Sequence, residues 1–330
     1  MKNEIIELSS SVIATGNAVG RKEYEGPLGR QFDICDADDR FGMETWEKAE
    51  SEMQRLAFNM ALKKACMGFE DVGALFAGDL LNQCVGSSYG LLGCGIPYFG
   101  IYGACSTCAE GMMLAATMTT HKVFRRCAAV TSSHNCSAER QYRTPIEYGG
   151  QRTPTSQWTV TGSGAFIIGD RNDGRVKITA GLPGRVIEKG ISDAGNMGAA
   201  MAPAVCDTLK RYFTQSDSRP EEYDLIVTGD LGYEGSSILC ELMSIEGYCL
   251  GGNYTDCGIL IYDRKTQDTH SGGSGCGCSA SVMSAHIIPK LESGELKRVL
   301  FIATGAMMSP DSIKQGQSIP AIGHLLLLEA

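Results

Sequence analysis

No stretch of the sequence is apolar over the roughly 20 residues that a helix needs to cross a bilayer. An apolar targeting segment is also missing, because residues 1–4 are mostly polar and lead into an amphipathic strand. Basic residues are fewer than acidic ones: the chain has 29 Lys and Arg and 38 Asp and Glu, so its formal net charge is −9. From these absences we expect neither a membrane-spanning protein nor a general nucleic-acid binder.

The 14 cysteines do not follow the regular spacing of a disulfide framework. In a chain that also lacks a secretory segment, this predicts free thiols in a reducing compartment and a cytoplasmic location. The 330 residues, of which 43% are hydrophobic and 20% charged, can bury a large core. We therefore expect a globular protein with two domains or with one large duplicated domain.

The two halves of the sequence follow the same order of elements. In each half a turn with Gly and Cys, at residues 103–105 and 275–276, opens a helix of small residues that is about four turns long. A buried strand follows, and a further strand that begins with Gly comes after a loop. This internal repeat predicts an α/β fold with two pseudo-symmetric halves, residues 1–181 and 182–330. Functional sites of such sheets form at the carboxyl ends of the strands. The residues at such ends are Cys105, His134, Asp230 and Gly275.

The strongest single feature is the segment around Cys105. Residues 96–102 are apolar and aromatic and predict a buried strand, Gly103 supplies the conformational freedom of a turn, and a helix begins at Ser106. The unpaired N–H groups and the dipole of a helix start lower the pKa of a thiol and attract anions. We therefore expect Cys105 to have a lowered pKa and to lie in an anion-binding site.

Two further expectations concern the elements around this segment. Residues 44–67 carry apolar residues at helical spacing and predict a helix that ends at Gly68. Residues 175–181 alternate polar and apolar side chains and predict an edge strand.

Eight short segments give the sequence a resemblance that covers nearly the whole chain. They are FAGDLLNQ (76–83), YGACST (102–107), TSSH (131–134), AERQYR (138–143), EYG (147–149), AAMAP (199–203), DLIVTGDLG (224–232) and GGSGCGCSA (272–280). These segments resemble the stage V sporulation protein AD family, which is part of the thiolase-like superfamily. The resemblance implies a duplicated thiolase-like fold, in which two βαβαβαββ halves form five layers in the order αβαβα.

The resemblance also implies what the protein does. It implies binding of dipicolinate (dipicolinic acid, a small-molecule dianion) together with Ca²⁺, for uptake into the developing spore through a membrane transport complex. The implied partners are the integral membrane proteins of the sporulation stage V transport complex, and the protein would associate peripherally with the spore inner membrane. A homodimer is implied as well, whereas no cofactor and no metal site of the protein's own is expected.

The sequence departs from the catalytic pattern of condensing enzymes in this superfamily. Those enzymes pair the cysteine nucleophile with His or Asn donors on strand-end loops of the second half. Here the strand at residues 224–228 runs into Gly229 and Asp230 without a His, and Ser274 stands where a thiolase carries a His. This pattern favours a binding protein without catalytic activity. The alternatives are an active condensing enzyme that uses Cys105 as its nucleophile, and a scaffold with a vestigial pocket.

The ligand site is expected at the mouth above Cys105, where backbone N–H groups and hydroxyls can bind carboxylates. Asp79 and Asp230 would repel a free dianion, but they can help to hold its calcium chelate. His134 is either a ligand contact or a structural residue of the core. The candidate ligand-binding residues are Cys105, Ser106, His134, Asp79, Asp230 and Ser274.

Two other patterns leave alternatives open. Arg140, Arg143 and Arg152 lie in one long loop, where they either bind the anion or form a solvated or dimer contact. Cys105 and Cys108 form a C-x-x-C pair that is typical of redox enzymes, but the duplicated architecture argues against that fold.

Overall fold

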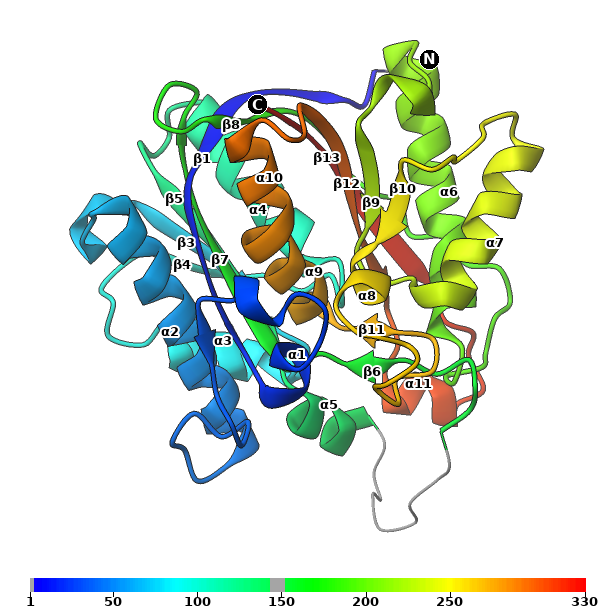
Figure 1. Cartoon of the computed structure of the whole chain (residues 1–330), viewed down its shortest axis with the longest axis horizontal. Coiled ribbons are helices and arrows are strands. Elements are labelled where there is room, and N and C mark those ends of the chain that lie inside the picture. The colour runs from blue at the N-terminus through cyan, green and yellow to red at the C-terminus, as the bar shows by residue number, and fades with distance from the viewer. Residues whose placement is uncertain (1–2, 143–151) are drawn as a thin grey trace.

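The computed structural model describes residues 3–142 and 152–330 of the chain. All of its strands except two short ones form one large mixed sheet with helices on both faces (Figure 1). Each half of the chain contributes a set of five strands to this sheet. The first set is β1 (Ile6–Val19), β3 (Ala74–Gly78), β4 (Tyr98–Gly100), β5 (Cys127–Ser133) and β7 (Gly162–Asp170). The second set is β8 (Val176–Leu182), β9 (Leu225–Thr228), β10 (Tyr254–Asp256), β12 (Arg298–Ala306) and β13 (Ala321–Glu329).

The order of the strands in the sheet shows the internal repeat. Along the sheet it is β10-β9-β12-β13-β8-β1-β7-β5-β3-β4, with the short β2 (Ile34–Cys35) beside β1. When the five strands of each half are numbered along the chain, both halves show the same order across the sheet. Read from the outer edge to the middle, it is third, second, fourth, fifth and first. The directions agree as well, because β4, β3 and β5 are parallel, as are β10, β9 and β12, whereas β7 and β13 are antiparallel to their neighbours. The predicted duplicated α/β fold is confirmed.

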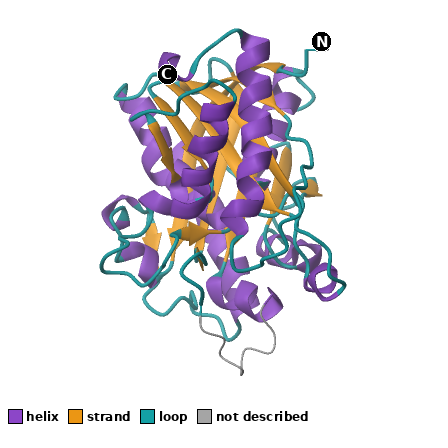
Figure 2. Cartoon of the chain, turned by 90° about the vertical axis from the view of Figure 1, so that its right-hand side faces the viewer, coloured by secondary structure: helices purple, strands orange, loops and turns teal. Residues whose placement is uncertain are grey.

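Helices lie outside and between the two halves of the sheet, which gives five layers (Figure 1). The outer face of the first half carries α2 (Trp46–Ala65) and α3 (Val85–Gly90). The space between the halves holds α4 (Thr107–Thr120) and α9 (Cys276–Val282), which continues through a π-helical turn into α10 (Ile288–Ser293). The outer face of the second half carries α6 (Met197–Ser216) and α7 (Gly232–Ile245). Figure 2 looks from the side of α6 and α7 and shows the strands behind helices.

Successive side chains of a strand pack into different buried clusters on the two faces of the sheet, which explains why the strand sequences are continuously apolar. In β7, Phe166 packs into the central cluster between the halves, whereas Ile167 packs into the cluster under α2. In β12, Phe301 packs into the central cluster and Ile302 into the cluster under α6. A strand that is covered on both faces has no position that must be polar. The five layers are thus held together by three apolar clusters, of which the central one packs against both halves of the sheet.

The two halves meet where β1 and β8 pair in antiparallel fashion. Because β8 also pairs with β13, it lies in the interior of the sheet. The prediction of an edge strand at residues 175–181 is therefore wrong, and the polar residues of its alternating pattern, Lys177 and Thr179, are only partly exposed. The expected division after residue 181 falls at the end of this strand, whereas the repeated strand order counts β8 with the second half.

Two other local predictions need correction. Strand β4 is not buried: it pairs with β3 alone in the described chain, and Phe99 in it is 45% exposed. An apolar run does not by itself distinguish an interior strand from an edge strand. Helix α2 ends at Ala65, because the next residue, Cys66, has a left-handed backbone (φ 54°) that closes the helix two residues before Gly68.

The loops at the carboxyl ends of the strands carry short elements of their own. These are α1 (Arg21–Tyr24), α5 (Asn135–Tyr142), α8 (Cys257–Leu260), α11 (Pro310–Lys314), β6 (Trp158–Thr159) and β11 (Gly273–Ser274). Short 3₁₀ turns occur at Gly29–Gln31, Phe69–Asp71, Asn82–Cys84 and Pro220–Glu222. Strands β6 and β11 pair with each other as a separate two-stranded sheet. In the part of the chain that the structure describes, no helix is both long and apolar enough to span a bilayer.

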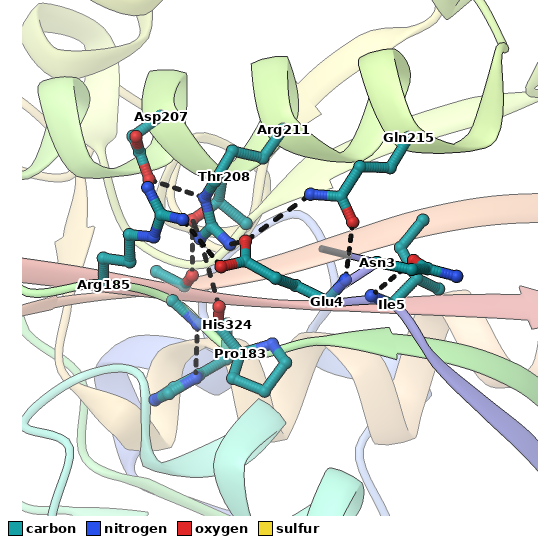
Figure 3. Close-up of polar contacts among 12 residues, drawn as sticks. Asn3, Glu4, Ile5, Pro183, Arg185, Asp207, Thr208, Arg211, Gln215 and His324 are labelled. Carbon is teal, nitrogen blue, oxygen red and sulfur yellow. Dashed lines mark hydrogen bonds and ion pairs between the residues drawn. The ribbon is translucent and has the colours of Figure 1, made fainter. Parts of the chain in front are cut away.

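A polar network ties the beginning of the chain to the second half (Figure 3). The Glu4 carboxylate accepts hydrogen bonds from Arg185 at 2.6 Å and from Arg211 of α6 at 2.8 Å. The Glu4 backbone N–H donates to Gln215 Oε1 at 2.7 Å, and Arg211 also donates to Asp207 at 2.8 Å. The two arginines lower the pKa of Glu4 to about 2. The residues that lead into β1 are therefore held against the outer helix of the other half.

Candidate functional site

A cavity lies above Cys105, where loops from the carboxyl ends of strands in both halves meet. It encloses roughly 680 Å³ of empty space, part of which is open to solvent. The first half contributes Leu80, which follows β3, and Tyr142 of α5, while the second half contributes Ser274 of β11 and Met308, which follows β12. The cavity is thus built jointly by the two halves.

The turn that presents Cys105 is held by local hydrogen bonds. Ser106 Oγ donates to the Gly103 carbonyl and Thr107 Oγ1 donates to the Ala104 carbonyl, both at 2.6 Å. The residue with positive φ in this turn is Ala104 (φ 51°). Gly103 therefore does not supply the conformational freedom that we expected of it. Gly103 is needed for close packing instead, because a Cβ there would lie 2.6 Å from Ser106 Oγ.

The Cys105 thiol has a pKa well above its usual value, not below it. The largest cause is burial, and the second is the carboxylate of Asp230, which disfavours a neighbouring negative charge. The expectation of a lowered pKa from the helix start is therefore wrong. At neutral pH the thiol is protonated and hydrogen-bonds to Asp230. A protonated thiol is a poor nucleophile.

Asp230 is fully buried and collects hydrogen bonds from the surrounding loops. Its carboxylate accepts from the Gly275 backbone N–H at 2.7 Å, from the Thr304 hydroxyl, and from Ser274 Oγ at 3.4 Å. Burial nevertheless raises its pKa to about 6. Cys105, Asp230 and Ser274 are the three candidate residues that the fold brings together. Of these three, Cys105 and Ser274 line the cavity, whereas Asp230 lies behind them.

The other three candidates also lie behind the walls of the cavity and not in its lining. Asp79 accepts hydrogen bonds from the Leu81 backbone N–H at 2.8 Å and from the Ser87 N–H and hydroxyl at 2.7 and 2.6 Å. These bonds hold the loop that presents Leu80 to the cavity. Ser106, as described above, is used within the Cys105 turn and is not exposed at all.

His134 has both ring nitrogens engaged in the core. Nε2 donates to the Asp39 carbonyl at 2.8 Å, and Nδ1 accepts from the Cys136 backbone N–H at 3.2 Å. The ring also packs 5.5 Å from the ring of Trp46, and burial lowers the pKa of the imidazole. His134 is therefore a neutral structural residue that fixes the start of α5, the helix beside the cavity.

The described loop arginines and the second cysteine of the C-x-x-C pair do not line the Cys105 cavity either. Arg140 pairs with Glu47 of α2, and Arg152 pairs with Asp268 at 2.8 Å. Arg143 lies outside the described residues. Cys108 is fully buried in the central apolar cluster. None of the five histidines of the chain, all in described segments, is among the residues that line the Cys105 cavity.

Most residues of the lining were missed in the sequence, including the polar Gln157 and Thr159. Gln157 and Thr159 lie beside and within β6, in a loop whose sequence predicts only a long excursion. A second missed signal is a repeat of Gly-Asp-Leu at residues 78–80 and 229–231, at the carboxyl end of the second strand of each half. It identifies Asp79 and Asp230 as equivalent positions, each of which stabilises a strand-end loop.

Comparisons with known proteins agree with this architecture. The profile of the family Stage V sporulation protein AD (SpoVAD) matches residues 2–329. Stage V sporulation protein AD of Bacillus subtilis (strain 168) is 43% identical over 318 residues, which are 96% of this chain and 94% of that protein.

Solved structures with low sequence identity share the fold. A variant of OleA from Xanthomonas campestris has a TM-score of 0.63 at 14% identity, with 100% of both chains covered. The 3-oxoacyl-[acyl-carrier-protein] synthase III from Aquifex aeolicus VF5 has a TM-score of 0.57 at 13% identity, with 97% of this chain and 100% of that chain covered. These likenesses show a thiolase-like fold. Taken with the match over nearly the whole sequence, they lead to one assignment: this chain belongs to the stage V sporulation protein AD family.

Proposed function

We propose that this sporulation-family protein binds dipicolinate, together with Ca²⁺, in the Cys105 cavity without catalysing a condensation. In the same proposal it works with the integral membrane proteins of the sporulation stage V transport complex at the spore inner membrane. Membership of the family supports the part of this proposal that concerns sporulation. The observation that carries the proposal is the state of Cys105, a buried and protonated thiol next to a carboxylate.

Condensation requires chemistry that this cavity does not favour. A cysteine nucleophile is activated by a neighbouring base or by a positive environment. Asp230 has the opposite effect, because its negative charge opposes the formation of a thiolate at Cys105. The reaction also needs polar donors for a developing carbanion, and no histidine is among the described residues that line the cavity. The cavity is thus better suited to hold a ligand than to transform an acyl thioester.

Two tyrosines offer a wall for a planar ring. The Tyr142 hydroxyl donates to the Leu80 carbonyl at 2.7 Å, so in the 3.0 Å contact between the two hydroxyls Tyr102 is the donor. Both hydroxyl protons are therefore used within the protein, and the rings remain to contact the ligand. Aromatic faces pack well against a planar aromatic acid such as dipicolinate.

The candidate residues divide into two roles in this proposal. Cys105 and Ser274 touch the ligand from the cavity floor and wall. Asp79, Ser106 and His134 are positioning residues, since each holds a loop or helix start that shapes the cavity. Asp230 is a positioning residue as well, because it holds the turn at Gly275.

The proposal is tested by narrowing the mouth of the cavity. Ala194 is exposed and lines the cavity, so Ala194→Trp should fill the mouth without disturbing the core. We expect calorimetry with dipicolinate and Ca²⁺ to show an affinity at least roughly tenfold lower, which corresponds to about 1.4 kcal/mol. Val186→Trp is the matched control, because Val186 is 62% exposed and does not line the cavity.

Three results would contradict the proposal. The first is a parent protein that binds no dipicolinate with or without Ca²⁺, and the second is equal affinity of the Ala194→Trp and Val186→Trp variants. The third is a steady release of free thiol from acetyl or malonyl thioesters that is lost in Cys105→Ala. That last result would favour an active condensing enzyme.

The same proposal includes a homodimer that forms across strand β4. This strand ends the sheet and leaves one side without a partner in the described chain. Tyr98, Phe99 and Tyr102 are 37%, 45% and 40% exposed there, and Tyr89 and Leu92 of the neighbouring α3 region are 68% and 76% exposed. Edge strands with exposed apolar side chains pair readily with another chain. A second copy of this protein would cover both features.

A further inference from the structure

A group of basic side chains lies at the end of the sheet opposite the Cys105 cavity. Two segments meet there: residues 121–126, which join α4 to β5, and residues 170–177, which include the turn between β7 and β8 (Figure 1). They are neighbours because β5 and β7 pair from the start of β5 onward, with Cys127 opposite Ile168. The two segments together contain six Lys and Arg but only two acids, in a chain whose net charge is −9. They are thus positive within an acidic protein.

Four of these bases are exposed, and none of the four forms an ion pair within the part of the chain that the structure describes. We call them the basic patch: Lys122, Arg125, Arg171 and Arg175. Two acids of this end lie beside another base instead, since Arg126 Nε is 3.7 Å from the Asp173 carboxylate and Arg126 Nη1 is 3.9 Å from that of Asp71. Asp170 is a further exposed acid, so positive charge prevails on this surface.

The turn that carries Arg171 and Arg175 is held in one shape. Lys177 Nζ donates to the Arg171 and Gly174 carbonyls, both at 2.5 Å, and the Gly174 N–H donates to Ser11 Oγ at 2.8 Å. Lys177 is therefore used within the protein, whereas the two arginines are presented to solvent from a fixed backbone. A surface whose backbone is already ordered loses less conformational entropy when it binds a partner.

The turn after α4 departs from local rules at two adjacent residues. The Val123 N–H donates to the Met118 carbonyl at 2.9 Å and the Lys122 N–H to the Thr119 carbonyl at 3.0 Å, which is the Schellman pattern. Its left-handed position usually holds Gly, but here it holds Lys122 (φ 58°). The next residue usually makes an apolar contact, but Val123 is 59% exposed. Natural sequences break such local rules mainly at functional sites, so this turn is a candidate binding surface.

We propose that the basic patch docks on a bilayer that contains anionic lipids, with Val123 in contact with the lipid headgroups. Basic side chains close to an anionic bilayer each add to the affinity. An acidic protein would match the charge as well, but the headgroup layer also accepts an aliphatic side chain among the bases. Docking at this end leaves the Cys105 cavity, at the opposite end of the strands, open to solution. The inference goes beyond the proposed function, which names membrane proteins as partners but no lipid-binding surface.

The test measures co-sedimentation of the full chain with two kinds of vesicle, phosphatidylcholine alone and phosphatidylcholine mixed with an equal part of phosphatidylglycerol. One variant combines Arg125→Glu with Arg171→Glu. Its matched control combines Lys189→Glu with Lys265→Glu, which changes the net charge equally at exposed sites outside the patch. A second pair of variants tests contact with the bilayer itself. It consists of Val123→Trp and, as its control, Val186→Trp, because these two valines are 59% and 62% exposed.

We expect the parent to bind the vesicles with phosphatidylglycerol but not the neutral ones, and to bind more weakly as salt is added. Arg125→Glu with Arg171→Glu should lower the affinity for the anionic vesicles at least roughly tenfold, whereas the Lys189 and Lys265 control should stay close to the parent. Val123→Trp should raise that affinity several-fold, and its fluorescence emission should shift to the blue on binding, because Trp favours the bilayer interface. Val186→Trp should show neither change.

Several outcomes would overturn the inference. A parent that ignores anionic vesicles would do so, as would equal losses in the two charge-reversed variants, because net charge and not the patch would then control binding. An unchanged emission of Val123→Trp would place the patch away from the bilayer, and this comparison decides even if a charge-reversed variant does not fold. Binding of poly-L-glutamate without binding of vesicles would assign the patch to an acidic protein. Dipicolinate affinity should be the same in the parent and in Arg125→Glu with Arg171→Glu, so the ligand-binding proposal stands or falls separately.

Discussion

Replacing Glu23 by Gln should make the stability of this protein less dependent on pH. Glu23 belongs to α1 and is fully buried. One carboxyl oxygen accepts hydrogen bonds from the Thr161 backbone N–H at 3.0 Å and from the Tyr262 hydroxyl, while the other has no partner in the described chain. Burial raises the pKa of this carboxyl from 4.5 to about 7. Gln resembles the protonated form, because it can accept the same two bonds and carries no charge.

The size and sign of the effect follow from the linkage of protonation to folding. A carboxyl with a raised pKa binds its proton more tightly in the folded state, so its contribution to stability is complete below the unfolded pKa of about 4.5 and is lost as the pH rises through about 7. A shift of about 2.5 units corresponds to roughly 3 kcal/mol. Between about pH 5 and pH 8 the free energy of unfolding of the parent should fall by about 2–3 kcal/mol relative to that of Glu23→Gln.

Urea denaturation of both proteins at several pH values measures this difference. Other buried carboxyls, such as Asp256 with a pKa raised to about 7 by burial, affect parent and variant alike and cancel in the comparison. Glu25→Gln is the control, because Glu25 is exposed and pairs with Arg21 on the surface. Parallel pH profiles for the parent and Glu23→Gln would refute the argument that burial keeps this carboxyl protonated.

Two further predictions concern the site and the edge of the sheet. Asp230→Asn should lower the pKa of the Cys105 thiol, because it removes the negative charge beside it, and alkylation by iodoacetamide below that pKa should be roughly tenfold faster for each unit of the decrease. An unchanged alkylation rate would show that burial alone controls the thiol. Phe99→Lys places a charge on strand β4 and should shift the proposed dimer toward monomer in light scattering, whereas Val123→Lys, at an exposed site elsewhere, should not. A strict monomer for the parent would contradict the proposed dimer.

The sequence by itself determined the class of fold and the position of its main turn. Continuous apolar strands alternating with helices require a sheet covered on both faces, and the repeated plan of the two halves requires two similar units. Both properties are local or periodic along the chain, so they can be recognised in a single sequence. The position of Cys105 between a strand and a helix was readable for the same reason, and the structure has α4 beginning two residues later.

Only the tertiary structure decided the chemical state of that cysteine. Asp230 is 125 residues away in the sequence, yet it lies beside the thiol, and its charge together with burial reverses the expected shift of the pKa. His134 has the sequence position of a ligand contact, but packing against Trp46 and a bond to the Asp39 carbonyl make it structural. Electrostatic effects depend on distance in space and on exclusion of water, neither of which a local pattern contains.

The same limit applies to the small sheet beside the cavity and to the edge of the large sheet. Gln157 and Ser274 become neighbours in one cavity only because β6 pairs with β11 across the two halves. Strand β4 has the apolar composition of an interior strand, but the strand order places it at the edge. Which strands pair is settled by the packing of the whole chain. The sequence therefore determined the elements, and the tertiary structure decided which side chains meet and which charges remain buried together.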